Sequence, residues 1–414
     1  MPLPAKVLRI GRAAADNDVV VTDLGVSRRH AELRRLPGGE YEIADLGSHN
    51  GTFLNGQRIT TATVTEADVI GIGPATLRLV GDELQEFVDG GDVSLDARGL
   101  TVTLPNGKVL LDDVSFPLSE RCLLGVIGPS GAGKSTLLGA LTGMRPATAG
   151  SVLYDGRDLY ANYAELRHRI GLVPQENILH TQLSAHRALG YAAELRFPSD
   201  TSPAERARRI DEVLGELSLT AHADTRTSSL SGGQQKCVNV ALELLTKPSL
   251  LFLDEPTSGL DPGLDMSVME MMSGLARDGR TVIVVTHSVA NLNVCDRLLV
   301  LVPGGKIAYF GSPADGLRHF GQPGWAQVFR ALRPSQIGTG RGSTGDRHTS
   351  PATRRCHRRP NTRQRWRSGR PRRRRSPRTG SRSCPPSSAG MWRSSPRTAT
   401  TWPCSPCCPS FSAA

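Results

Sequence analysis

The stretch "LLGVIGPSGAGKSTLLGALTG", residues 123–143, decides the fold of the larger part of this 414-residue chain. It opens with a mainly apolar run, as in a buried strand, and closes with a helical pattern. Between them stands "GPSGAGKS", residues 128–135, which matches G-x-x-x-x-G-K-[ST]. In this loop, backbone N–H groups surround a phosphate at the positive end of a helix. The order strand, loop, helix therefore predicts a phosphate-binding site.

Two further apolar runs extend this pattern along the chain. "SLLFLDEP" and "TVIVVTHS" have nearly all-apolar centres, as strands buried on both faces should. From about residue 98 to 325, β-rich runs alternate with helical patterns, which predicts an α/β domain with a largely parallel core sheet. Asp254 ends the first of these runs and is placed to hold a Mg2+ shell. Glu255 follows at the strand tip, where a carboxylate can orient a water molecule and accept its proton.

Four more side chains extend the expected phosphate chemistry. Lys134 reaches the β- and γ-phosphate oxygens, and the Ser135 hydroxyl completes the Mg2+ shell. Gln175, in "GLVPQEN", follows a strand where its amide can touch metal or water, and His287 ends another buried strand where imidazole can bond a γ-phosphate. A lone Gln or His at a strand end is mostly structural. Their meaning comes from their order relative to the other motifs.

Taken together, these motifs resemble the ATP-binding subunit of ABC transporters over about residues 98–330. "LSGGQ", residues 230–234, resembles the signature of that family, and "SGLD", residues 258–261, its D-loop. "VALELLTKPSLLFLDEPTSGLD" narrows the resemblance to G-type (White-like) half-transporters. One departure is an aliphatic Leu104 near the position of an adenine-stacking aromatic, since leucine offers no π-face. ATP as the substrate is therefore implied by the resemblance more than by this residue.

The resemblance also implies a set of site residues, with Mg2+ as the cofactor that accompanies ATP. The catalytic residues would be Glu255, His287 and Gln175, and the metal would be held by Ser135, Gln175 and Asp254. The nucleotide-binding residues would be Gly128, Pro129, Ser130, Gly131, Ala132, Gly133, Lys134, Ser135, Thr136, Ser231, Gly232, Gly233 and Gln234.

The second glycine-rich turn implies that one chain does not complete its own site. In ABC ATPases the signature faces the γ-phosphate held by the other subunit. Ser231 and the N–H groups of Gly232 and Gly233 would act there as an anion-binding turn at a helix N-terminus. We therefore expect a head-to-tail homodimer, or a dimer with a related ATPase subunit, that encloses two ATP molecules.

The N-terminal region has a different pattern. Residues 1–82 contain short strand-like runs separated by turns such as "PGGE" and "LNGQ", which predicts an all-β sandwich. "IGRAAADNDVVVTDLGVSRRHAEL" followed by "DLGSHNGTFLNG" resembles a forkhead-associated (FHA) domain, a family that binds phosphothreonine peptides through loops at one end of the sandwich. Turn residues of an ordinary sandwich are the alternative reading. Only ten residues precede Gly11, so the first strand of the family is expected to be missing.

The residues expected to recognise phosphothreonine follow from their chemistry. Two arginines give charge-assisted donors to a phosphate, a serine gives a hydroxyl, and two asparagines can hold the peptide backbone. His30 is expected to be a structural hydrogen-bonding residue. The set is Arg12, Ser27, Arg28, Asn50 and Asn55.

The last segment differs in composition from everything before it. Residues 341–414 hold 18 Arg, no Lys, one acidic residue and ten Pro, and they contain no Leu, Ile or Val. They cannot build a core, so a disordered tail is expected from residue 331 to 414. Since the net charge of the chain is +11, the remainder is mildly acidic. A GC-rich gene read in a wrong frame gives such a composition, so we hypothesise a frameshift or truncation close to where G-type relatives continue toward their membrane helices.

The expected architecture is thus multidomain. It comprises an all-β FHA sandwich (residues 1–82), a linker (83–97), an α/β P-loop ABC ATPase domain (98–330) and a disordered C-terminal tail (331–414). Cys122, Cys237 and Cys295 are widely spaced, which favours reduced thiols. Lys6 and Arg9 interrupt the apolar start, so no signal peptide is expected. The sequence contains no run of about 18 apolar residues, the length that a membrane-spanning helix needs.

The expected function is ATP hydrolysis coupled to export, with regulation by a phosphothreonine protein bound to the FHA module. The transmembrane domain would be a separate partner, and the chain would lie at the cytoplasmic face of the plasma membrane, or free in the cytoplasm without that partner. Two alternatives stay open: a soluble ABC ATPase that contacts nucleic acid through its Arg-rich tail, and a phosphopeptide adaptor whose ATPase is inert. Nucleic acid is not the expected partner, because a frameshift in GC-rich DNA explains the tail composition better than nucleic-acid binding does.

Overall fold

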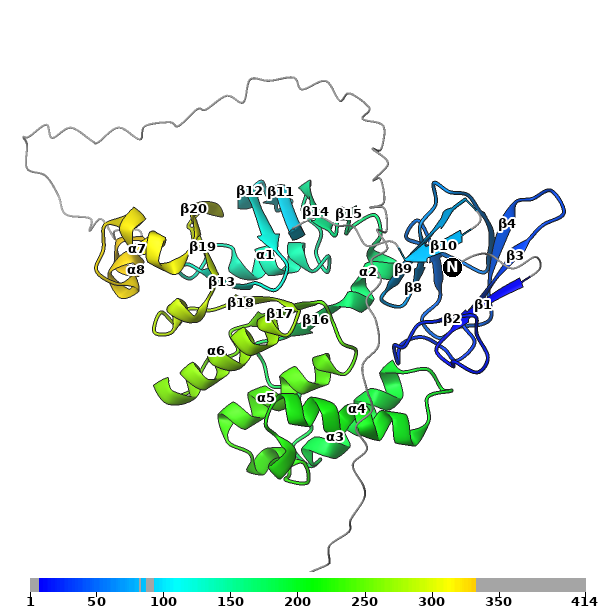
Figure 1. Cartoon of the computed structure of the whole chain (residues 1–414). Helices are drawn as coiled ribbons and strands as arrows, with labels where there is room; N and C mark the ends of the chain where they lie inside the picture. The colour runs from blue at the N-terminus through cyan, green and yellow to red at the C-terminus, as the bar shows by residue number, and fades with distance from the viewer. Residues whose placement is uncertain (1–6, 82, 87–92, 333–414) are drawn as a thin grey trace, which may run out of the picture. The chain divides into compact units, whose positions relative to one another are not determined.

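The computed structural model describes residues 7–81, 83–86 and 93–332 (Figure 1). The expected disordered tail lies outside these residues except for residues 331–332. We call residues 7–86 the N-terminal module and residues 93–332 the C-terminal module; both belong to one compact unit, Met1–Gly340. In the described part of the chain no helix is long and apolar enough to cross a membrane.

The N-terminal module is a sandwich of two five-stranded sheets, which confirms the expected all-β fold. Apolar side chains alternate along its strands and meet in one core, to which Ile10 and Leu33 contribute from one sheet and Ile72 and Leu77 from the other. The first sheet has the order β2 (Val19–Val20), β1 (Val7–Gly11), β3 (Ala31–Arg35), β4 (Tyr41–Asp45) and β7 (Thr61–Val64); the second has the order β10 (Glu83–Glu86), β9 (Ala75–Val80), β8 (Ile70–Ile72), β5 (Thr52–Leu54) and β6 (Gln57–Ile59).

The linker expected at residues 83–97 is shorter in the structure. Residues 83–86 form β10, which pairs with β9 through Leu84 opposite Leu79. Residues from Val93 onward belong to the first strand of the C-terminal module. Strand pairing at both ends explains the difference, because backbone hydrogen bonding to a sheet overrides an acidic, glycine-containing sequence. The absence of a first FHA strand before Gly11 stays a prediction.

The C-terminal module contains two sheets. The smaller one is antiparallel, and the larger one is a six-stranded sheet in which every described pairing except that of β19 with β20 is parallel. The smaller has the order β12 (Val109–Ser119), β11 (Val93–Thr103), β14 (Ala149–Tyr154) and β15 (Arg157–Asp158); the larger has the order β16 (Ile170–Val173), β17 (Leu250–Asp254), β18 (Thr281–Val285), β13 (Leu123–Ile127), β19 (Arg297–Val302) and β20 (Lys306–Gly311).

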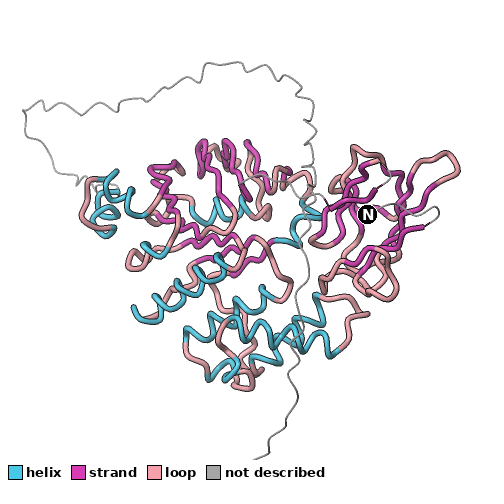
Figure 2. Tube along the Cα trace, in the orientation of Figure 1, coloured by secondary structure: helices cyan, strands magenta, loops and turns pink. Residues whose placement is uncertain are grey.

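Both faces of the six-stranded sheet are covered, which explains why its strands are apolar throughout. Helices α5 (Gly232–Leu244) and α6 (Pro262–Arg277) pack on one face, and α1 (Lys134–Leu141) with the antiparallel sheet packs on the other (Figures 1 and 2). Within β17, Leu251 and Leu253 point to the first core while Leu250 and Phe252 point to the second. The expected α/β domain with a largely parallel core sheet is therefore confirmed.

The helices of the C-terminal module are α1 (Lys134–Leu141), α2 (Tyr163–Leu166), η1 (Arg167–Arg169), α3 (Ala185–Arg196), α4 (Pro203–Glu216), η2 (Thr220–His222), η3 (Thr227–Ser229), α5 (Gly232–Leu244), α6 (Pro262–Arg277), η4 (Leu292–Val294), α7 (Pro313–Phe320) and α8 (Trp325–Leu332). A Ser or Asp side chain caps the N-terminus of α3, α4, α5, α6 and α7, which fixes where these helices begin.

Candidate functional site

The phosphate loop follows β13 directly and leads into α1, as the sequence predicted. Gly133 is the residue before α1 and has φ 98°, a left-handed conformation. A Cβ at Gly133 would lie 2.7 Å from the carbonyl oxygen of Leu110, so only glycine fits there. Lys134 Nζ donates hydrogen bonds to the carbonyl oxygens of Gly128 at 2.9 Å and of Pro129 at 3.4 Å. The lysine side chain is therefore held across its own loop.

The charges around Lys134 come from the tip of the neighbouring strand. Burial lowers the pKa of Lys134, and the carboxylates of Glu255 and Asp254 oppose that shift. Burial, and after it the charge of Glu255, raises the pKa of Asp254, while Lys134 lowers it. Glu255 also interacts with the ammonium group of Lys236, so two lysines face the two carboxylates of the strand tip.

Glu255 brings the expected catalytic residues together. Gln175 Nε2 donates to Glu255 Oε2 at 2.9 Å, and His287 Nδ1 lies 3.1 Å from the same oxygen. The backbone of Glu255 has φ 48°, a conformation that non-glycine residues rarely adopt, and its N–H donates to the carbonyl of Val285 at 2.8 Å. Left-handed backbone at a strand tip turns the side chain out of the sheet toward its partners. Such strain is common at functional sites.

The residues expected to hold Mg2+ supply oxygen donors only. They are the Ser135 hydroxyl, the Asp254 carboxylate and the Gln175 amide oxygen, which suit a hard cation that keeps several waters. Among the described residues no group of three or more His, Cys, Asp or Glu side chains could hold a metal ion. The oxygen donors of Ser135, Asp254 and Gln175 fit a metal held by one carboxylate and by its nucleotide.

The signature turn is built as a helix N-terminus. Ser231 is the N-cap of α5: its hydroxyl accepts from the Gln234 backbone N–H at 3.3 Å, and Gln234 Oε1 accepts from the Ser231 N–H at 2.9 Å. Ser231 and Gly232 are exposed, so the first turn of α5 presents its N–H groups to the surface. Gln234 Nε2 also contacts His222 Nε2 at 2.8 Å. In this chain the Gln234 side chain therefore supports the turn.

The two phosphate elements are not joined within one chain. In the described ranges, no hydrogen bond or ion pair links residues 231–234 to residues 128–136. A contact that sequence reasoning missed connects the signature helix to the catalytic group instead: Lys236 Nζ, on α5, donates to the carbonyl of Gln175 at 2.8 Å. The only sequence sign was the position of Lys236 two residues after the signature.

Leu104, which stands near the expected adenine-stacking position, is 37% exposed at the turn between β11 and β12.

The residues expected to bind phosphothreonine gather at one end of the N-terminal module, with one exception. The Ser27 hydroxyl accepts from the His49 N–H at 3.2 Å, and Asn50 Nδ2 donates to the carbonyl of Gly25 at 2.7 Å. Asn55, by contrast, is engaged in its own hairpin through Asp68 and Val69. The geometry gives Asn55 a turn-stabilising role.

His30 fulfils the structural role expected of it. It is fully buried, its Nδ1 lies 3.2 Å from the Ser27 N–H, and its Nε2 lies 3.1 Å from the carbonyl oxygen of Gly51. Burial lowers the pKa of His30, so the neutral ring is favoured. A neutral imidazole joins the two loops that carry Ser27 and Asn50.

Arg12 and Arg28 meet acidic residues that the sequence did not point to. Arg12 is only 8% exposed; its Nε donates to the Val26 carbonyl at 3.0 Å, and its Nη2 donates to Asp200 Oδ1 at 3.2 Å. The Arg28 backbone N–H donates to Asp200 Oδ2 at 2.7 Å, and Glu205 pairs with both guanidinium groups. Asp200 and Glu205 lie more than 170 residues further along the chain, so no local pattern could reveal this contact.

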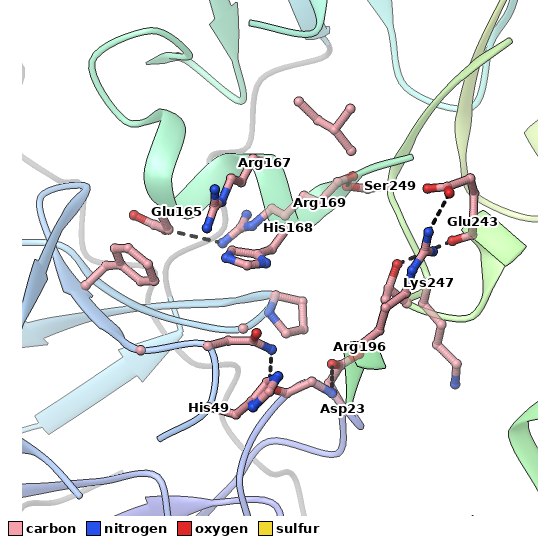
Figure 3. Close-up of a pocket in the computed structure, with 18 of the residues that line it drawn as sticks. Asp23, His49, Glu165, Arg167, His168, Arg169, Arg196, Glu243, Lys247 and Ser249 are labelled. Atoms are coloured by element: carbon pink, nitrogen blue, oxygen red, sulfur yellow. Dashed lines mark hydrogen bonds and ion pairs between the residues drawn. The ribbon is translucent and has the colours of Figure 1, made fainter. Parts of the chain in front are cut away.

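A cavity of about 480 Å³ lies away from the phosphate loop, between the loops around residues 23–25 and 49–51 and the start of β16 (Figure 3). Two of the arginines that line it, Arg169 and Arg196, are held in ion pairs. Arg196 binds Glu243 at 2.6 Å, and Arg169 lies 3.7 Å from Glu165, which Arg157 also holds. These internal pairs favour a structural role for the charges that line it.

Comparison with known proteins agrees with both modules. The family model described as "ABC transporter" matches residues 111–258, and the FHA domain model matches residues 8–73. The chain is 49% identical over 337 residues to the ABC transporter ATP-binding/permease protein Rv1747 of Mycobacterium tuberculosis, covering 80% of this chain and 38% of that protein. It is 36% identical over 256 residues to ABC transporter G family member 11 of Arabidopsis thaliana, covering 58% of this chain and 35% of that protein.

A solved structure gives the same result for the fold. The structure of cbiO1 from Clostridium perfringens, described as part of the ABC transporter complex cbiONQ, is 26% identical, with a TM-score of 0.52, and covers 58% of this chain and 95% of that one. The chain spans between 31% and 38% of the length of the first three curated relatives. The phosphate loop, the strand-tip carboxylates and both family models lead to one conclusion: this chain joins an FHA domain to the ATP-hydrolysing domain of the ABC transporter family, and its ATPase domain is similar to those of G-family members.

Proposed function

We propose that this chain is the ATP-driven motor of an ABC exporter, coupled to a transmembrane partner at the cytoplasmic face of the plasma membrane and regulated by a phosphothreonine protein. The observation that carries the motor assignment is the convergence of Gln175 and His287 on Glu255, beside Asp254 and the lysine-bearing loop. These groups lie at the carboxyl edge of the parallel sheet, where ligands of such sheets bind.

The proposed chemistry assigns a separate task to each residue. Lys134 and the loop N–H groups hold the β- and γ-phosphates, and Glu255 orients the attacking water and accepts its proton. Gln175 and His287 fix the Glu255 carboxylate, since both contact its Oε2. Mg2+, held by Asp254 and Ser135, would neutralise charge on the phosphate oxygens. Ser231 of a second copy would close the site from the other side.

We expect the transmembrane partner to be encoded next to this sequence, because the relatives of this chain include an ATP-binding/permease protein and G-family transporters. Translating the following DNA in all three frames should show several apolar segments of about 20 residues each. A neighbourhood without such segments in any frame would contradict the coupling of this motor to a linked membrane domain.

The regulatory part of the proposal predicts that Arg12→Ala weakens binding of a phosphothreonine peptide by about tenfold or more. Two charge-assisted hydrogen bonds to the phosphate are lost with the guanidinium group. Fluorescence anisotropy with matched phosphorylated and unphosphorylated peptides measures the change. Arg29→Ala is the matched control, because the Arg29 side chain is 67% exposed on the neighbouring loop, which also carries Arg28. Equal affinity of the wild-type chain for both peptides would refute phosphothreonine recognition.

A further inference from the structure

The segment Asp200–Glu205, which runs from the loop after α3 through the first turn of α4, contacts the loops of the N-terminal module that carry Arg12 and Arg28. We call it the acidic segment. The Asp200 carboxylate uses both of its oxygens there: Oδ1 accepts from Arg12 Nη2 at 3.2 Å, and Oδ2 accepts from the Arg28 backbone N–H at 2.7 Å. A guanidinium and a backbone N–H that donate to one anion are the kind of donors that bind a phosphate group.

Glu205 supplies a second negative charge to the same two arginines. Its carboxylate pairs with Arg12 Nη1 and lies 3.6 Å from Arg28 Nη2. Burial raises the pKa of Glu205, but hydrogen bonds from Ser202 and the charge of Arg12 outweigh burial and lower it to about 2. Glu205 is therefore ionised at neutral pH, and two carboxylates face two guanidinium groups.

All three nitrogens of the Arg12 guanidinium are engaged by these contacts. Its Nε bonds the Val26 carbonyl, its Nη1 bonds Glu205, and its Nη2 bonds Asp200 and lies 3.4 Å from Thr201 Oγ1. The Arg12 side chain is 8% exposed and Thr201 is 2% exposed. A phosphopeptide cannot reach Arg12 while the acidic segment stays in place.

The acidic segment is held rigidly from its other side. Ser202 caps α4, with Glu205 completing a capping box, and Arg209 on the buried face of α4 donates to the carbonyls of Leu244 and Leu245 at the end of α5. A preformed segment loses little conformational entropy when it occupies a site in the same chain. Its effective concentration at the site is also high, so it competes strongly with a free peptide.

We propose that the acidic segment is an intramolecular ligand of the phosphothreonine site, so that a phosphothreonine peptide binds by displacing it from Arg12 and Arg28. This inference rests on the proposed recognition of phosphothreonine by the N-terminal module. A phosphate carries nearly two charges and three acceptor oxygens, and it can therefore outcompete a carboxylate at the same donors.

The test uses the full chain with Asp200→Ala and Glu205→Gln combined. Glutamine at 205 keeps the capping box of α4, because Glu and Gln serve equally there. Asp211→Ala, an exposed acidic residue of the same helix, is the matched control. Anisotropy titration with a phosphothreonine peptide should show affinity about tenfold tighter for the double variant, since the competitor is gone, and no change for the control.

A second readout follows docking without any peptide. The Arg28 amide donates to Asp200 at 2.7 Å, so hydrogen exchange of this amide should be faster in the double variant than in the wild type or the control. Unchanged exchange would overturn the proposal, as would faster exchange with unchanged or weaker peptide affinity. If no variant and no wild-type chain prefers the phosphorylated peptide, phosphothreonine recognition itself is refuted, and the exchange result then tells whether the docking contact exists.

Discussion

Glu255→Gln should lower the ATP turnover of this chain by about two to three orders of magnitude, the typical contribution of a positioned general base. Glutamine has nearly the shape of glutamate, so its amide oxygen can still accept the hydrogen bond that Gln175 Nε2 donates at 2.9 Å. What is lost is the negative charge and the capacity to accept a proton from water. Release of phosphate from ATP with Mg2+ measures this change.

The same variant should accumulate as a dimer in ATP and Mg2+, because the nucleotide bridges both copies until it is hydrolysed. Sedimentation velocity with and without ATP measures the association. Glu270→Gln is the matched control, since Glu270 is exposed on α6 and lies outside the site. Turnover within tenfold of the wild type would exclude Glu255 as the base, and an inactive variant that stays monomeric at saturating ATP would contradict the shared site.

Ser231→Asp is expected to reduce turnover by about a hundredfold while leaving the ATP affinity of the isolated chain unchanged. Aspartate caps a helix as well as serine does, so the hydrogen bond from the Gln234 N–H is retained and α5 still begins at Gly232. The new carboxylate, however, would face the γ-phosphate held by the other copy, and like charges at close range repel. The cost resembles the loss of one transition-state donor.

Ser231→Asn is the control for this variant, because asparagine also caps helices but adds no charge. Titration with a fluorescent ATP analogue measures binding to the isolated chain, and a phosphate-release assay measures turnover. A fall in analogue affinity comparable to the fall in turnover would mean that Ser231 acts on the nucleotide of its own chain. That outcome would contradict the head-to-tail arrangement.

The sequence predicted the centre of the site well, because parallel strands end at one edge of their sheet. Apolar runs ending in Asp254 and His287 placed these side chains at that edge, and the loop before Lys134 placed the lysine beside them. The left-handed backbone of Glu255 and the bond from Lys236 to Gln175 were not predictable. Both depend on how neighbouring loops pack, and the hydrophobic periodicity of the sequence gives no information about loop packing.

The contacts between modules were beyond sequence reasoning for another reason. In the structure, "SDTSPAER", residues 199–206, forms a helix cap at Ser202. Nothing in this local sequence indicates that Glu205 also pairs with Arg12, 193 residues away. The linker bounds failed similarly, because strand pairing decided them. The expected tail, apart from residues 331–332 at the end of α8, lies outside the described residues, so its disorder and the frameshift stay predictions.

The hydrogen bonds from Arg209 to the carbonyls at the end of α5 have a consequence for how the two sites are connected. Helix α5 has 13 residues, a rod about 20 Å long at 1.5 Å per residue. One end of α5 follows Ser231, and a carbonyl at its other end accepts a hydrogen bond from Arg209 of α4. Helix α4 is also the helix whose first turn contacts Arg12. A phosphorylated protein bound to the N-terminal module and ATP bound at the signature turn would thus act on opposite ends of the same helix, α5.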